Sequence, residues 1–195
     1  MNYPTPIAII PEFLTPQECD LIIGTAERLE WDPGMIGGGG KQIDADGSEG
    51  WHGGKRDSKI RQSDIKWIQH GMMGEELDNK ITQGINSCNM TSGWNFAWSE
   101  VEHHQYTVYH HRDNFDAEWS KAVKDGTAVS GDHYTWHQDS GPFDQGERPG
   151  FIRKLSSTIQ LSDPDDYEGG TFQYIDPSGI FDQLSTNPRK FNIDQ

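Results

Sequence analysis

The chain has 195 residues, enough for one domain with a hydrophobic core. Its formal net charge of −15 argues against binding nucleic acid or an anionic membrane through a general electrostatic field, because those partners are negative too. The 22 Gly, 7 Trp, 6 Tyr and 8 Phe favour a turn-rich β protein with aromatic packing.

The cysteine content and the N-terminal residues bear on whether the protein is exported. Cys19 and Cys88 are too few for a disulfide framework, so a reduced, cytoplasmic location is expected. The first apolar run is short and interrupted by prolines, so neither a signal peptide nor a transmembrane span is predicted.

The first hundred residues predict a helical and strand support. Residues Ile7 to Ile10 are expected to form a strand. A capping box, Thr15-Pro16-Gln17-Glu18, and apolar residues at helical spacing predict a helix from about Pro16 to Glu30. The glycine-rich stretch from Trp31 to Asp57 is expected to be a loop, either a lid over a site or a plain surface loop.

Further elements follow from the spacing of apolar residues. Arg61 to Ile68 is expected to be extended and to enter a helical turn. A second helix is predicted from Gly74 to Ser87, followed by strands at Trp94 to Trp98 and at Val101 to Tyr109. The charged stretch from His111 to Ser130 is expected to be a partly helical insertion.

Two histidine pairs invite a metal interpretation, which we do not adopt. The pairs are His103-His104 and His110-His111. Neighbouring side chains in a strand point to opposite faces, so neither pair can chelate one ion through both rings.

The segment Gly131-Asp132-His133-Tyr134-Thr135-Trp136-His137-Gln138-Asp139 is the chemically most informative stretch. Alternation along a strand places Tyr134 and Trp136 on one face, and His137 and Asp139 on the other. An imidazole and a carboxylate two residues apart are two-thirds of the 2-His-1-carboxylate triad that holds non-haem Fe(II). A bare His-x-Asp is also common in ordinary turns, so the surrounding sequence must decide.

Downstream of this motif the sequence predicts a loop at 140–150, a strand from Arg153 to Asp163 and a turn at Asp163-Pro164-Asp165-Asp166. A last strand is predicted from Thr171 to Ile175, and the remainder is expected to be loop-like. The polar face of the strand from Arg153 is expected either to be solvated or to line a pocket.

Several of these segments agree, in order, with one family. They are the capped first helix, Gln105 to Tyr109, the motif at 131–139, Arg153-Lys154-Leu155-Ser156-Ser157, and Leu161-Ser162-Asp163 with Tyr167-Glu168-Gly169-Gly170. Together they resemble the prolyl 4-hydroxylase-like branch of the Fe(II)/2-oxoglutarate-dependent oxygenases, from about Ile7 to about Ile175.

The resemblance implies a mostly β fold with flanking helices, a double-stranded β-helix or jelly roll. It implies one domain over 1–195, with 1–100 as support and 101–195 as the first part of the jelly-roll core. It also implies Fe(II), 2-oxoglutarate and O₂, with ascorbate as a further cofactor. The substrate would be a peptidyl proline, another protein side chain or a small molecule.

The resemblance also implies roles for individual residues. His137 and Asp139 would bind Fe(II). Tyr109 and Ser156 match positions near 2-oxoglutarate. Tyr134 and Trp136 match positions near the substrate, although core packing is an equal alternative for Trp136.

Part of the family pattern is missing. The family needs a second histidine and then a basic residue for the distal carboxylate of 2-oxoglutarate, but no histidine follows His137. We therefore assign no role to Arg189 or Lys190. The expected explanations are an incomplete sequence of a longer enzyme, a partner chain that supplies the remaining strands, or a degenerate protein.

Two functional classes remain open from the sequence. The first is an Fe(II)- and 2-oxoglutarate-dependent hydroxylase, with poor activity expected from these 195 residues alone. The second is a non-catalytic jelly-roll binding module, or an inactive fragment, that keeps part of the metal site.

Overall fold

A computed structural model of the chain describes residues 7–36, 40–43, 49–52, 57, 59–111, 131–139, 152–168, 170, 172–174 and 189–191. The chain divides into two compact units. One comprises Met1–Thr25, Gly71–Val101 and Ser157–Gln195, and the other comprises Ala26–His70 and Glu102–Ser156.

The first helix, α1 (Pro16–Glu27), begins at the predicted capping box. The backbone N–H of Thr15 donates to Glu18 Oε2 at 2.7 Å, and the backbone N–H of Glu18 donates to Thr15 Oγ1 at 3.3 Å. This reciprocal pairing satisfies two backbone donors that a helix start leaves open. The prediction of a helix at this position is confirmed, although α1 ends three residues earlier than Glu30.

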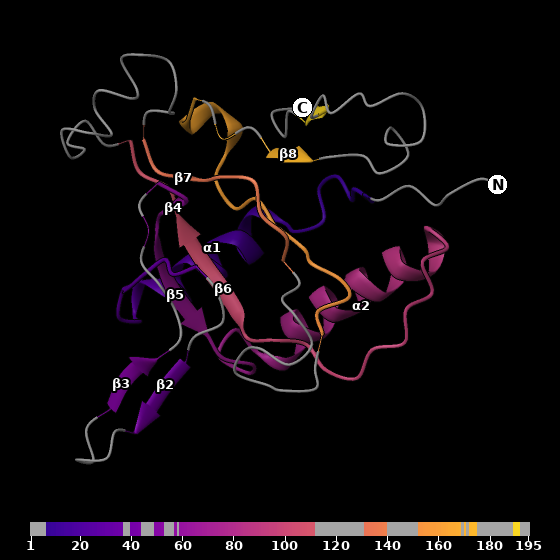
Figure 1. Cartoon of the computed structure of the whole chain (residues 1–195). Helices are drawn as coiled ribbons and strands as arrows, with labels where there is room; N and C mark the ends of the chain where they lie inside the picture. Colours follow the sequence, from indigo (N-terminus) through magenta and orange to yellow (C-terminus); the bar gives the residue numbers. More distant parts are fainter. Residues whose placement is uncertain are drawn as a thin grey trace, which may run out of the picture. The chain divides into compact units, whose positions relative to one another are not determined.

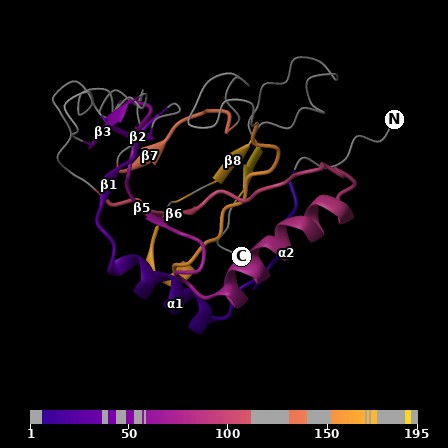
Figure 2. The same cartoon turned by 90° about the horizontal axis from the view of Figure 1, so that it is seen from below.

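The second helix, α2 (Glu75–Thr91), buries Leu77 and Ile81, as the apolar spacing predicted. It is a neighbour of α1 in Figure 2, and Lys80 of α2 donates to the Glu18 carboxylate of α1 at 2.7 Å. This bond to Lys80 is the main reason that the pKa of Glu18 lies below its ordinary value, and the bond from Thr15 acts in the same direction.

The strand predicted at Trp94 to Trp98 is wrong. The N–H groups of Trp94 and Asn95 both donate to the Asn89 carbonyl at 3.1 Å, and Asn95 has a φ of 52°. The Asn89 side chain then bonds both the N–H and the C=O of Phe96, at 2.9 and 3.0 Å. These bonds occupy the backbone groups that a strand would use for a ladder.

The rest of this unit has little regular structure in the described residues. A 3₁₀ turn (Pro164–Asp166) follows Asp163, whose side chain accepts the N–H of Asp165, and this confirms the predicted turn. Strand β8 (Phe172–Tyr174) pairs with β9 (Arg189–Phe191). The strand predicted from Thr171 is therefore confirmed, whereas β9 lies where a loop was expected.

The other unit contains a three-stranded antiparallel sheet in the order β1-β5-β6, and its strands β5 and β6 lie side by side in Figure 1. Its strands are β1 (Asp32–Pro33), β5 (Asp64–Ile68) and β6 (His104–Val108). Ile65 and Ile68 of β5 are buried, with 4% and 1% of their surface exposed. The extended segments predicted at Arg61 to Ile68 and at Val101 to Tyr109 are confirmed as strand at 61–62, 64–68 and 104–108, whereas residues 101–103 and 109 carry no strand.

Two shorter strand pairs complete this unit. Strands β2 (Gly40–Ile43) and β3 (Glu49–His52) form an antiparallel pair inside the stretch from Trp31 to Asp57 that was predicted to be a loop. That prediction is wrong for these residues and also for β1. Strand β4 (Arg61–Gln62) pairs with β7 (His133–Tyr134). Only these two residues of the motif at 131–139 are in a strand, because the chain bends at Trp136.

Other expectations are not met or lie outside the described residues. Residues 7–10 and 153–161 carry no strand, although Leu155, Ile159 and Leu161 are half-buried. Most of the predicted insertion and the loop at 140–150 lie outside the described residues. Within the described ranges the structure shows two helices and small antiparallel sheets, in which no jelly roll or barrel is identified. None of the described helices is long and apolar enough to cross a membrane.

Candidate metal centres

The two predicted metal ligands lie side by side. Nε2 of His137 is 3.1 Å from Oδ1 of Asp139, and both side chains are partly exposed. On the other side of the ring, Nδ1 of His137 is 2.7 Å from the carbonyl oxygen of Thr135. A carbonyl oxygen can only accept, so Nδ1 carries a hydrogen. Nε2 faces the Asp139 carboxylate, and it is the ring nitrogen that could bind a metal in place of the ion pair with Asp139.

This geometry fits a first-row divalent metal ion. Adjacent ligands of an octahedral ion with bonds of about 2.1 Å lie about 3 Å apart, close to the observed separation of Nε2 and Oδ1. A ligand histidine usually donates its second ring N–H to a carbonyl or carboxylate, as Nδ1 does here. His137 and Asp139 therefore supply two suitable donors on one side of an ion.

Tyr134 does not lie on the face opposite His137, where strand alternation predicted it. Tyr134 stacks on His137, with ring centroids 3.5 Å apart and 9° between the planes. Simple alternation put these two side chains on opposite faces, but the bend at Trp136 brings them to the same side. Trp136 itself is 51% exposed, so it does not pack in a core.

Tyr109 lies in the same neighbourhood. The chain after β6 is joined to the start of the motif, because the N–H of Asp132 donates to the His110 carbonyl at 2.9 Å and the N–H of His110 donates to Asp132 Oδ2 at 3.0 Å. Although 51% of the surface of Tyr109 is exposed, loss of hydration is the main reason that the pKa of its hydroxyl lies above the ordinary value; nearby Arg61 lowers this pKa, and Tyr134 and Asp132 raise it. Tyr109 therefore lies near Tyr134 and Arg61.

Ser156 makes no hydrogen bond to the residues around His137 in the part of the chain that the structure describes. It is an exposed residue in a stretch that carries no strand, and no hydrogen bond within the described ranges joins its hydroxyl to Tyr109 or His137. Its expected role near 2-oxoglutarate stays a prediction, as does that of Tyr109.

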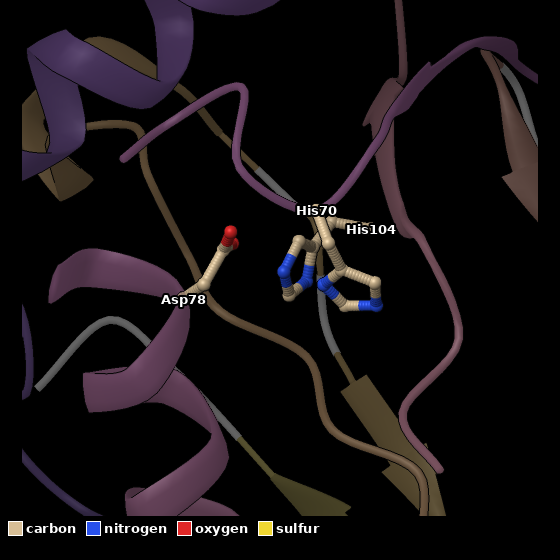
Figure 3. Close-up of side chains that lie close together, drawn as sticks. All are labelled: His70, Asp78 and His104. Carbon is tan, nitrogen blue, oxygen red and sulfur yellow. The ribbon is translucent and has the colours of Figure 1, made fainter. Parts of the chain in front are cut away.

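A second group of possible ligands involves His70, Asp78 and His104 (Figure 3). The register of β5 and β6 pairs Ile68 with His104, and His70 follows two residues later. The rings of His70 and His104 lie 5.1 Å apart between centroids, at an angle of 77°. Asp78 lies in the first turn of α2, where its Oδ2 accepts the N–H of Gly71, the residue next to His70, at 2.5 Å.

This group could hold a metal ion. One ligand atom from each of the three residues lies within 4.8 Å of the others. Two imidazoles and a carboxylate suit zinc, iron, nickel or copper, and the donor set does not choose among them. Ligand atoms around a bound ion lie closer together than this, about 3 to 3.5 Å, so small side-chain rotations would accompany binding.

Sequence reasoning missed this group. The sequence analysis set His103 and His104 aside as metal ligands, whereas His104 belongs to a group that could hold a metal ion, and the rings of both residues lie 5.1 Å from that of His70. The missed partner is His70, which lies in the turn two residues after the end of β5. If the pairing of residues 61–68 with residues 101–109 had been known, it would have placed His70 near His104. The sequence alone does not give that strand register.

The second group makes a direct prediction. In the His137→Ala background, His104→Ala should weaken Co(II) binding by at least the roughly 10- to 100-fold that loss of an outer-shell partner costs. His103→Ala is the matched control, because His103 is the neighbour of His104 and its ring also lies 5.1 Å from that of His70. Visible absorption of bound Co(II) would measure the affinities. Equal affinities in the two variants would exclude His104 as a ligand.

Comparisons with protein-family models, curated proteins and solved structures find no match for this chain. Function is therefore inferred from the residues themselves.

Proposed function

We propose that the protein is an Fe(II)- and 2-oxoglutarate-dependent dioxygenase that hydroxylates an unactivated C–H bond of a peptidyl proline or a similar side chain. The proposal includes the double-stranded β-helix fold that the sequence resemblance implies. Bound iron would couple the oxidative decarboxylation of 2-oxoglutarate to the hydroxylation of the substrate.

One observation carries the proposal: the relation of His137 to Asp139. Nε2 and Oδ1 are separated by 3.1 Å, and the Thr135 carbonyl accepts from Nδ1, which leaves Nε2 for the metal. A His-x-Asp pair in an ordinary turn makes the same 3.1 Å contact as an ion pair when the imidazole is protonated, and a metal ion bound by Nε2 and Oδ1 would take the place of that proton. The remaining coordination positions would be open to 2-oxoglutarate and O₂, as this chemistry requires.

The other residues would bind and orient 2-oxoglutarate and the substrate. The Tyr109 hydroxyl would donate a hydrogen bond to a 2-oxoglutarate carboxylate. A tyrosine hydroxyl is protonated, and therefore a donor, at neutral pH, and the upward shift of the Tyr109 pKa acts in the same direction. Ser156 would offer a second hydroxyl to the same cosubstrate. The exposed ring of Trp136 would be available to stack on a proline side chain, whereas the ring of Tyr134 is already covered by His137.

A second candidate is a non-catalytic binding module that keeps part of the site. The observation in its favour is that, of the described residues, only His137 and Asp139 supply donors at this centre, where the iron triad has three. This candidate predicts that the double change His137→Ala, Asp139→Ala leaves ligand binding unchanged.

An anaerobic titration with Fe(II) and 2-oxoglutarate tests the first proposal. Binding of the 2-oxo acid to the iron should produce a visible charge-transfer band. The band should disappear in His137→Ala and persist in His104→Ala, which alters only the second group. Absence of the band from the unaltered chain, or its survival in His137→Ala, would contradict the proposal.

A further inference from the structure

We propose that Arg61 is a positioning residue for His137, acting through the ring of Tyr134. The guanidinium carbon of Arg61 lies 4.7 Å from the centroid of the Tyr134 ring, and that ring stacks on His137 at 3.5 Å. Arg61 would not touch the metal. The inference rests on the proposed function in one respect, that His137 is a metal ligand.

Arg61 is a buried charge, with only 7% of its surface exposed. Its Nε donates to Ser63 Oγ at 3.0 Å, one terminal nitrogen donates to the Met35 carbonyl at 3.3 Å, and the other donates to Gln105 Oε1 at 2.6 Å. These three partners are uncharged, so they fix the guanidinium plane without neutralising it. The face of Tyr134 then offers the cation an electrostatic partner.

The backbone holds the two side chains opposite each other. In the β4–β7 pair Arg61 is the cross-strand partner of Tyr134, and the next bond runs from the N–H of Thr135 to the Ile60 carbonyl at 2.8 Å. Thr135 is also the residue whose carbonyl accepts from His137 Nδ1. The hydrogen bonds between β4 and β7 therefore hold Arg61 opposite Tyr134, and they also fix Thr135, whose carbonyl accepts from Nδ1 of His137.

Gly34 shows how closely Arg61 is enclosed. A Cβ atom at this position would lie 2.4 Å from Ser63 Oγ and 2.7 Å from Arg61 Nε, inside contact distance for both. The N–H of Gly34 also donates to the Ser63 carbonyl at 2.9 Å, so the backbone there cannot easily withdraw. Gly34→Ala should displace Arg61 while leaving Arg61, Tyr134 and His137 chemically unchanged.

Positioning and simple electrostatics predict opposite signs. If Arg61 acted on the metal through its charge alone, removing the charge would reduce repulsion and tighten the binding of a cation. If it positions His137 through Tyr134, removing the guanidinium lets the stack move and weakens binding. Arg61→Met therefore distinguishes positioning of His137 from an electrostatic effect on the metal. Arg61→Lys keeps the charge and tests whether the planar set of guanidinium donors is needed.

The experiment is a Co(II) titration of the full chain carrying His70→Ala and His104→Ala, so that only the His137 centre reports. Arg61→Met, Arg61→Lys and Gly34→Ala should each weaken binding by about 10- to 100-fold, the usual cost of losing a group that orients a ligand. Tyr134→Leu should have a similar effect, and Tyr134→Phe should have little, because its ring keeps the stack. Adding Arg61→Met to Tyr134→Leu should cause no further loss.

A second readout does not depend on the metal. In the metal-free chain the Cε1–H resonance of His137 should be displaced by the Tyr134 ring, and Arg61→Met and Gly34→Ala should reduce that displacement. Thermal unfolding of each variant identifies any that fails to fold; Arg61→Lys and Gly34→Ala then carry the test.

The outcomes separate the two proposals. Loss of Co(II) binding in His137→Ala, together with unaltered or tighter binding in the Arg61 variants, overturns the role of Arg61 and leaves the proposed function. Unaltered Co(II) binding in His137→Ala overturns the assigned ligand, and with it the role of Arg61 at a metal. An unaltered His137 resonance in both Arg61→Met and Gly34→Ala overturns the positioning role whatever the metal does.

Discussion

Asp139→Asn is expected to weaken Fe(II) binding by at least about 100-fold and to reduce 2-oxoglutarate-dependent succinate formation in proportion. The substitution keeps the shape of the side chain but replaces an anionic oxygen donor by a neutral amide. Outer-shell partners alone are worth roughly 10- to 100-fold in metal affinity, and a directly bound carboxylate should be worth more. Equilibrium titration with Fe(II) under argon, followed by a succinate assay with ascorbate present, measures both effects.

The local chain should survive this change. Arg153 donates to the backbone carbonyl of Asp139 at 3.0 Å and also bonds Glu102, and neither bond involves the Asp139 carboxylate. Gln138→Ala is the matched control, because Gln138 is the exposed neighbour of both ligands and contributes no donor in the proposal. Full affinity in Asp139→Asn would exclude this carboxylate as a ligand. An equal loss in Gln138→Ala would point to disturbance of the loop.

The helices were predictable because their information is local. Thr15 and Glu18 satisfy each other's backbone groups whatever the rest of the chain does, and Leu77 and Ile81 define one face of α2 by spacing alone. The end of α2 was not predictable in the same way. Asn89 holds the backbone of Phe96 seven residues later, and no periodicity reports such a bond.

The candidate site was predictable as a set of residues but not as an arrangement. His137 and Asp139 lie together because only Gln138 separates them in the sequence. The stack of Tyr134 on His137 depends on the bend at Trp136, which strand alternation cannot anticipate. Arg61 joins the group only through the β4–β7 register, which pairs residues more than seventy positions apart in the sequence. Such pairings depend on how the strands pack in the folded chain, and the spacing of residues within one segment of the sequence does not predict them.

Ile68→Ala is expected to have the largest effect on stability, about 2 to 5 kcal/mol of the free energy of unfolding. Among the residues that the structure describes, Ile68 is the largest fully buried side chain, with 1% of its surface exposed, and it ends β5 opposite His104. Removing it loses the transfer free energy of three carbon atoms and leaves a cavity in rigid surroundings. Urea unfolding followed by circular dichroism measures the change.

Graded controls separate burial from strand position in this experiment. Ile68→Val keeps the branched shape and should cost about 0.5 to 1.5 kcal/mol. Ile152→Ala, at a residue that is 40% exposed, should cost clearly less than Ile68→Ala. Ile68 pairs across the strands with His104 of the second group and not with either proposed ligand of the His137 centre. Co(II) affinity at His137, measured at a urea concentration well below the unfolding midpoint, should therefore stay at its original value. A loss of affinity in folded Ile68→Ala would show that β5 transmits its packing to the metal centre, and Arg61, which lies just before β5, would be the residue to follow.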